Sequence, residues 1–200
     1  MHAHVRRLNF AYGADSLFNE FDFSTSSQLT VLLGSSGSGK TTLLKLLAGH
    51  LEPSSGEVVV PRDDVFLVLQ EDALFPWLTG WSNLTTLLPI SRAEISQHSL
   101  FPWVSSFIDR RAHEMSFGQR RIIELLRALV AKPRLLLLDE PFNFLDPDLR
   151  DAVASCLVSS LPPDSECILS THHGAELRNF PCSLYQFPKQ RPIHQLEASA

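Results

Sequence analysis

Apolar and polar positions alternate in the first part of the chain. Leu8 and Phe10 are separated by one residue, and so are Phe21 and Phe23. A period of two is typical of strands that bury one face and expose the other. We therefore expect two half-buried strands before residue 25, joined by the turn Gly13-Ala14-Asp15.

Continuous apolar runs predict further strands, and these should be buried on both faces as in a parallel sheet. They lie at 29–33, 135–138 and 167–170, and valine-rich segments at 56–60 and 65–69 predict two shorter strands. The segment 184–187 is expected to be the last strand. The chain after Pro188 is expected to be loosely held.

Three segments have helical spacing and recognisable ends. The first begins near Thr41 and should end at Gly49, a residue that favours a left-handed terminator. The second begins at Ser116, which forms a capping-box pattern with Gln119. The third begins after Asp146 with proline at the first helical position. Strands and helices that alternate in this way predict an α/β fold.

The region from Glu71 to about Glu114 has only weak helical periodicity and is crowded with aromatic residues and prolines. We expect a separate, smaller lobe there. It holds all three tryptophans of the chain, Trp77, Trp81 and Trp103. Exposed aromatic residues beside proline are typical of a docking surface, but the same rings can form the lobe's own core, so both interpretations stay open.

Length and charge narrow the function. Two hundred residues fit a single domain, and a formal charge of −5 argues against a protein that binds mainly to nucleic-acid phosphates. No apolar run is long enough to cross a bilayer, and residues 1–7 lack the apolar core of a signal peptide, so we expect a cytoplasmic chain. Three widely spaced cysteines do not predict a disulfide framework or a thiolate zinc site.

A glycine-rich loop, Gly34-Ser35-Ser36-Gly37-Ser38-Gly39-Lys40-Thr41, separates a predicted strand from a predicted helix. Glycines let such a loop turn its N–H groups inward around a phosphate at the positive end of the helix. Lys40 then supplies a positive charge for the phosphates, and Thr41 offers a hydroxyl to Mg²⁺. A merely flexible Gly/Ser turn is the alternative, but the flanking strand and helix favour a phosphate site.

Other polar residues follow the ends of predicted strands, at the sheet edge where α/β proteins bind ligands. Asp139 and Glu140 follow the leucine run, and one carboxylate can hold a metal while the other positions water. His172, at the end of another strand, is better placed to meet a phosphate than to bind metal. Tyr12 is either a packing residue or a platform for an adenine ring.

These residues, taken in chain order, resemble the ATP-binding cassette of ABC transporters. Residues 34–42 resemble the Walker A motif, Gln70 the Q-loop, 115–119 the LSGGQ signature, 135–140 Walker B with its adjoining glutamate, and 144–146 the D-loop. His172 resembles the switch histidine and Tyr12 the aromatic A-loop residue. Any one match is weak, whereas seven in order are specific.

The resemblance implies a P-loop NTPase (RecA-like) core with an N-terminal antiparallel β subdomain and a small helical subdomain at about 71–132, within a single domain of residues 1–200. It implies that ATP is sandwiched in a head-to-tail homodimer, with Mg²⁺ held by Thr41, Gln70 and Asp139. The implied catalytic residues are Lys40, Gln70, Glu140 and His172. The implied nucleotide contacts are Tyr12, Gly34, Ser35, Ser36, Gly37, Ser38, Gly39, Lys40, Thr41, Thr42, Ser116, Gly118 and Gln119.

The resemblance also implies partners: integral membrane permease subunits, a substrate-binding protein, and a position at the cytoplasmic face of the cell membrane. The segment 70–79 is similar to the corresponding part of bacterial importers of the nitrate, sulfonate and taurine group. The residues at 137–142 together with those at 145–147 are common among bacterial importer cassettes, including those for thiamine. One departure is Phe117, where the family usually has glycine. A soluble cassette that clamps a macromolecule and a subunit that no longer hydrolyses ATP are the alternatives.

Overall fold

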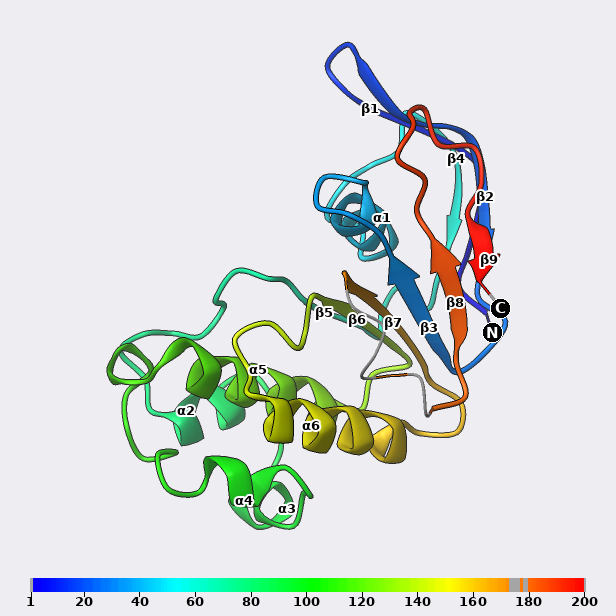
Figure 1. Ribbon diagram of the computed structural model, residues 1–200. Helices are drawn as coiled ribbons and strands as arrows, with labels where there is room; N and C mark the ends of the chain where they lie inside the picture. Colours follow the sequence, from blue (N-terminus) through cyan, green and yellow to red (C-terminus); the bar gives the residue numbers. More distant parts are fainter. Residues whose placement is uncertain (1, 173–176, 178–179, 200) are drawn as a thin grey trace. The chain divides into compact units, whose positions relative to one another are not determined.

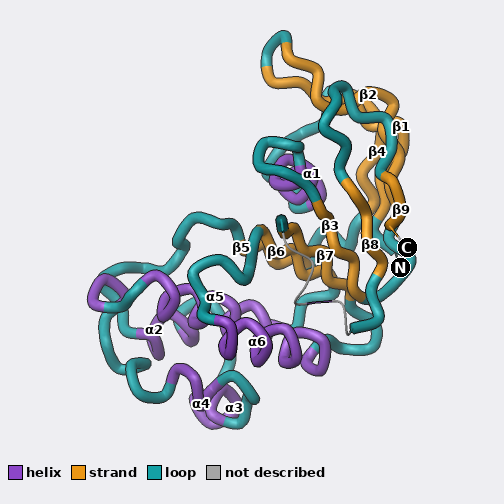
Figure 2. Tube along the Cα trace, viewed as in Figure 1, coloured by secondary structure: helices purple, strands orange, loops and turns teal. Residues whose placement is uncertain are grey.

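The computed structural model describes residues 2–172, 177 and 180–199 (Figure 1). The chain forms two compact units. The first comprises Met1–Leu67, Pro133–Glu140 and Pro162–Ala200, and the second comprises Val68–Lys132 and Pro141–Leu161. Strands predominate in the first unit and helices in the second (Figure 2).

The antiparallel sheet of the first unit has the order β2-β1-β4. Its strands are β1 (His4–Tyr12), β2 (Asp15–Ser24) and β4 (Ser55–Val59). The predicted alternation is confirmed, because Leu8 and Phe10 of β1 and Phe21 and Phe23 of β2 are all buried. Register shifts in β1 after Val5 and Leu8 bend this strand pair.

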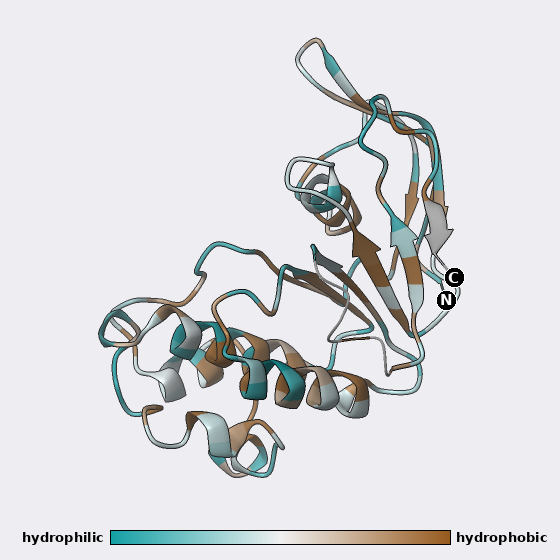
Figure 3. Cartoon of the chain, in the orientation of Figure 1, coloured by the Kyte–Doolittle hydropathy of each residue, from teal (hydrophilic) through white to brown (hydrophobic). Residues whose placement is uncertain are grey.

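The larger sheet has the order β5-β6-β7-β3-β8-β9. Its strands are β3 (Leu29–Leu33), β5 (Val65–Val68), β6 (Leu135–Asp139), β7 (Glu166–Thr171), β8 (Ser183–Gln186) and β9 (Glu197–Ser199). β3 pairs in parallel with β7 and β8, β6 pairs in parallel with β7, and β9 is antiparallel to β8. Figure 3 shows the central strands β3 and β6 as strongly hydrophobic.

Helix α1 (Lys40–Leu47) follows β3 and packs its leucines into the core of the first unit. Leu43 and Leu44 are fully buried there with Leu32 of β3 and Leu137 of β6. The helix ends as the sequence predicts, since Gly49 adopts a φ of +72° and its N–H bonds to the carbonyl of Leu46 at 3.1 Å.

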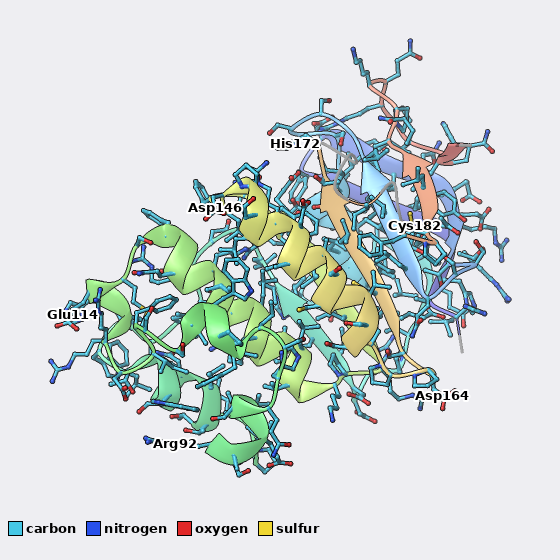
Figure 4. The ribbon with its side chains drawn as sticks, turned by 60° about the horizontal axis from the view of Figure 1, so that its bottom comes forward. Arg92, Glu114, Asp146, Asp164, His172 and Cys182 are labelled. Carbon is cyan, nitrogen blue, oxygen red and sulfur yellow. The ribbon has the colours of Figure 1, made fainter. Side chains whose placement is uncertain are left out.

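The second unit contains two long helices and three short ones. They are α2 (Gly80–Thr85), α3 (Arg92–Ser96), α4 (Phe101–Val104), α5 (Phe117–Ala131) and α6 (Pro147–Ser160), with a 3₁₀ turn at Ala112–Glu114. The predicted caps of the long helices are confirmed. Ser116 and Gln119 form both bonds of a capping box, and the Asp146 side chain accepts from the N–H of Leu149 at 3.0 Å. Figure 4 labels Asp146 at the start of α6.

The prediction of a loosely held chain after Pro188 is wrong. Ile193 is fully buried, its N–H donates to the carbonyl of Leu17 at 2.8 Å, and β9 adds a further strand after β8. The sequence conceals this because Ile193 stands alone among proline and polar residues, so no periodicity marks it. Burial of one branched side chain and pairing along β2 nevertheless fix the segment.

Among the described residues, no helix combines the length and apolar character that a membrane crossing requires. The three cysteines form no disulfide, and Cys167 lies fully buried in β7, where burial raises the pKa of its thiol.

Candidate functional site

The glycine-rich loop lies between the end of β3 and the first turn of α1. It turns sharply at Ser35–Ser38, where the N–H of Ser38 donates to the carbonyl of Ser35 at 3.3 Å. Gly37, inside this turn, has a φ of +74°, and Gly39, the residue before α1, has a φ of +110°. Side chains rarely tolerate these conformations, so the two glycines are required for the path of the loop.

Lys40 is the first residue of α1 and only 5% exposed. Its ammonium group donates to the carbonyl oxygens of Gly34 and Ser35, at 2.7 and 3.1 Å, and lies 3.6 Å from a carboxylate oxygen of Glu140. The loop thus wraps around the ammonium group of its own lysine, next to the loop N–H groups that would bind a phosphate.

The loop passes a simple test for binding a phosphate. The hydroxyl of Ser38 is buried and makes no hydrogen bond within the described part of the chain. A buried hydroxyl without a partner is costly, and a phosphate oxygen in the nest would satisfy it. The N-terminus of α1, whose first N–H groups lack helical partners, adds favourable electrostatics for an anion.

Thr41 and Asp139 come together from α1 and β6. The Thr41 hydroxyl donates to Asp139 at 2.7 Å, and the Ser170 hydroxyl of β7 donates to the other carboxylate oxygen at 2.5 Å. Asp139 is almost fully buried, and Ser170 is buried completely. One carboxylate next to one hydroxyl suits Mg²⁺, which takes a few oxygen ligands from protein and the rest from water and phosphate.

Glu140 follows β6 in an unusual backbone conformation, with a φ of +49°. Its N–H donates to both the carbonyl and the hydroxyl of Ser170, at 3.2 and 3.1 Å. Its carboxylate lies 3.0 Å from Nδ1 of His172, the residue after β7 that Figure 4 labels. A left-handed glutamate is strained, and such strain is concentrated at functional sites. Lys40 and His172 therefore both lie close to the Glu140 carboxylate.

Tyr12 combines features of both predicted roles. Its ring packs edge-on against Phe10, with centroids 4.9 Å apart, and its hydroxyl lies 3.3 Å from that of Thr42 in α1. The side chain is nevertheless 53% exposed. A ring fixed by two contacts and open to solvent can receive a flat base, so packing and stacking do not exclude each other here.

The signature residues lie in the second unit. Ser116 is exposed, and Gly118 and Gln119 are half-buried at the start of α5. Gly118 has a packing role, because a Cβ there would lie 2.8 Å from the carbonyl oxygen of Phe144. Phe144 has a φ of +67°. The D-loop backbone thus approaches the signature helix so closely that only glycine fits.

Phe117 and Phe144 form an exposed aromatic pair. Their ring centroids are 5.7 Å apart, and the side chains are 64% and 63% exposed. The guanidinium of Arg120 lies 4.4 Å from the Phe117 ring, a cation–π contact. The unusual Phe117 therefore has defined neighbours in its own chain and does not fill a core.

Gln70 is exposed and belongs to the second unit. The loop after it is held by buried charges of α5. Glu124 accepts from the N–H of Ala73 at 2.5 Å and from Arg121 at 3.2 Å, and Arg121 donates to the carbonyl of Leu69 at 2.6 Å. Burial raises the pKa of Glu124, although the bonds from Ala73 and Arg121 oppose this.

Arg127 is the second buried cation of α5. It donates to the carbonyl of Ala73 at 3.3 Å, while its Nε and Nη1 find no hydrogen-bond partner in the described part of the chain. Burial lowers the pKa of Arg127, and the charges of Glu124 and Asp72 counteract that effect. Asp72 itself pairs with Arg120.

The tryptophans divide between the two roles left open above. Trp81 is 9% exposed and packs against Phe101, with ring centroids 5.5 Å apart, so it belongs to the core of the second unit. Trp77 is 65% exposed and lies 5.7 Å from the ring of Phe75. Only Trp77 and the partly exposed Trp103 therefore remain available for docking.

Sequence reasoning missed two residues of these sites. Ser170 links Asp139 to Glu140, and its only signal is a polar residue at the end of a buried strand. Glu124 lies on the apolar face of a strongly amphipathic helix, where a carboxylate predicts a buried partner. Neither position belongs to a motif that spacing alone reveals.

A strand, a glycine-rich loop, a helix with a buried first lysine, and two consecutive carboxylates at the end of another parallel strand of the same sheet define the class of P-loop NTPases. Residues 19–143 match the family model described as ABC transporter, which is more than half of the chain. The chain therefore belongs to the ABC transporter family.

Several relatives of this chain are named as ATP-binding proteins of importers. The chain is 39% identical to the taurine import ATP-binding protein TauB of Pseudomonas fluorescens (strain Pf0-1), over 74% of this chain and 62% of that protein. It is 32% identical to the Fe(3+) ions import ATP-binding protein FbpC of Mesorhizobium japonicum, over 98% of this chain and 65% of that protein. The chain spans 55% to 65% of the length of these and two further curated relatives.

The fold agrees with solved structures. A structure described as the ATP binding subunit of an ABC transporter superposes with a TM-score of 0.81 at 21% identity, over 94% of this chain and 86% of that chain. At this identity the likeness concerns the fold, and it confirms the predicted P-loop NTPase core.

Proposed function

We propose that this chain is the ATP-hydrolysing subunit of an ABC transporter that powers import through a separate permease. The observation that carries the proposal is the convergence of Lys40, Thr41, Asp139, Glu140 and His172 from α1 and from the ends of β6 and β7, all in one unit. The import names of its relatives support the direction of transport.

The residues of the first unit suit phosphoryl transfer to water. The loop N–H groups and Lys40 would bind the phosphates, and Tyr12 would hold the adenine ring. Mg²⁺, when bound, neutralises charge on the phosphates. Thr41 and Asp139 fit as its protein ligands, with Gln70 as the third proposed group. Glu140 is oriented by His172 and would take the proton from water that attacks the γ-phosphorus, as ADP leaves.

The assembly is also part of the proposal. Two copies would pair head to tail, so that Ser116, Gly118 and Gln119 of one copy cover the nucleotide of the other. The helical subdomain, residues 71–132, would face the permease at the cytoplasmic side of the membrane. Exposed Trp77 supports a docking role there. A substrate-binding protein would deliver the cargo.

The decisive experiment separates binding from hydrolysis. Glu140→Gln keeps the shape of the side chain but removes its basicity, so we expect turnover to fall by about 100-fold or more while ATP affinity is retained. Steady-state ATPase rates and calorimetric titration with ATP measure the two effects. Glu57→Gln, an exposed change on β4, is the matched control and should leave both unchanged. Unchanged turnover in Glu140→Gln would refute the assigned role.

Isolation from membranes tests the transport role. The Glu140→Gln chain, held in ATP, should be recovered from detergent-solubilised membranes together with an integral membrane permease. Recovery only with soluble macromolecules would favour the clamping alternative and contradict the proposal.

A further inference from the structure

The segment between β8 and β9 lies against the glycine-rich loop. We name residues 187–194 the strap; it is the orange-to-red loop above β8 in Figure 1. Ile193, near its end, donates from its N–H to the carbonyl of Leu17 at 2.8 Å and accepts from the N–H of Asn19 at 3.1 Å. These bonds, and the complete burial of Ile193, fix the strap along β2.

Two apolar residues of the strap fit against glycines of the loop. A Cβ on Gly34 would lie 2.9 Å from the Cβ of Phe187, and a Cβ on Gly39 would lie 3.5 Å from Cδ1 of Ile193. Both Phe187 and Ile193 are buried. The strap therefore packs where these two glycines leave room, at the beginning and the end of the loop.

Arg191 provides the polar contact, in the middle of the strap. Its Nη2 donates to the carbonyl oxygen of Gly37, and its Nη1 donates to the carboxylate of Asp15 at 3.0 Å. The guanidinium fork thus joins the glycine-rich loop to the first residue of β2. All three glycines of the loop consequently have a neighbour in the strap.

The contact at Gly37 fixes the peptide plane between Gly37 and Ser38. This peptide is planar, so its carbonyl and its N–H point in opposite directions. The carbonyl bonds to Arg191, and the N–H bonds to the carbonyl of Ser35 across the turn. Without Arg191, the weak bond at 3.3 Å would be the one hydrogen bond given for this peptide by the described residues, next to a glycine that has many accessible conformations.

We infer that Arg191 is a positioning residue of the nucleotide site, which holds the glycine-rich loop in the conformation that receives phosphate. The inference rests on the proposed function, because it assumes that the loop binds a nucleotide. Arg191 acts on nucleotide binding and not on the chemical step, since its contacts are with the Gly37 carbonyl and with the Asp15 carboxylate.

The test uses the full chain and ATP or ADP as probes. Arg191→Ala should weaken binding of both nucleotides by about three- to tenfold, the range for a charged hydrogen bond at a partly exposed position. KM should rise by the same factor, with kcat unchanged. Arg191→Lys keeps the charge but loses the two-pronged guanidinium group, so its affinity for ATP should lie between that of the unchanged chain and that of Arg191→Ala. Amide exchange at Ser38 should be faster in Arg191→Ala.

Lys189→Ala is the control, because it removes an exposed positive charge from the same strap. If Arg191→Ala binds ATP as tightly as Lys189→Ala does, the inference is wrong. A fall in kcat equal to the rise in KM would also overturn it. Lys40→Ala, measured in parallel, separates the two proposals: if that variant keeps its ATP affinity, the nucleotide site itself is wrong.

Discussion

Both compact units bury charged side chains, but they arrange them differently. In the first unit, Lys40 and Glu140 lie 3.6 Å apart at the ends of secondary-structure elements, beside a loop whose buried Ser38 hydroxyl has no hydrogen-bond partner among the described residues. In the second unit, Arg121 and Glu124 lie along one helix and bond to each other and to the backbone at Leu69 and Ala73.

The difference indicates what each set of charges does. Charges placed around a loop with spare hydrogen-bonding capacity are available to a ligand, whereas charges bonded to a neighbouring backbone segment hold that segment in place. Removing a charge from the first set should therefore change binding more than stability. Removing one from the second set should do the opposite.

Glu124→Ala should show the largest effect. It removes the carboxylate bonded to Arg121, the negative charge that acts most strongly on buried Arg127, and the acceptor for Ala73, so we expect a loss of about 3 kcal/mol in the free energy of unfolding. Denaturant titration measures it. Asp109→Ala, at an exposed position in the same unit, removes the same charge. If Glu124→Ala and Asp109→Ala had equal free energies of unfolding, the buried charges of the second unit would not have the structural role assigned to them.

Lys40→Ala should have a smaller effect, and on a different quantity. The buried ammonium bonds to two carbonyl oxygens of the loop and would face the phosphates, so its loss should weaken ATP binding by about 30- to 100-fold, or about 2–3 kcal/mol. Calorimetry measures the affinity, and denaturant titration should show a change in stability below about 1 kcal/mol. Lys45→Ala, on the same helix, is the control. A stability loss like that of Glu124→Ala would mean that Lys40 is structural.

The smallest expected effect is a pH dependence of stability. Glu124 has a raised pKa in the folded chain, above the ordinary 4.5, because burial disfavours its charge. Its contribution is fully present below the unfolded-state pKa and is lost as pH rises through the higher folded-state pKa, because the folded state holds the proton more tightly. Arg121, Arg127, Asp72 and the Ala73 N–H are the groups that act on it.

Glu124→Gln should remove this decline, measured as the free energy of unfolding against pH above 4.5. Glu94 should give a pH dependence of stability in the opposite direction, because the bonds from the Ser91 hydroxyl and N–H lower its pKa. Its contribution is present above the ordinary value and is lost as pH falls through the lower one. A decline with rising pH that persists in Glu124→Gln would show that another group causes it.

Local patterns predicted most of the secondary structure. The glycine-rich loop, the cap at Ser116 and the leucine strand before Asp139 are each recorded in a few consecutive residues, because turns, caps and double-sided burial depend on local chemistry. The same holds for the candidate phosphate site, whose strand, loop and helix are contiguous. The boundaries of α1 and β4 differ from prediction by one or two residues, which is the usual uncertainty at helix and strand ends.

Only the tertiary structure could reveal contacts between distant segments. Ser170 of β7 bonds both to Asp139 and to the N–H of Glu140, at the end of the adjacent strand β6. Arg191 bonds to Gly37, which is more than 150 residues away along the chain. Such contacts leave no periodic signal, because a single serine or arginine has no preference for a particular distant partner. The amino-acid sequence by itself determined which residues are the candidates for phosphate chemistry. Only the folded structure decided which distant side chains hold these residues in place, because packing and strand pairing set the distances between them.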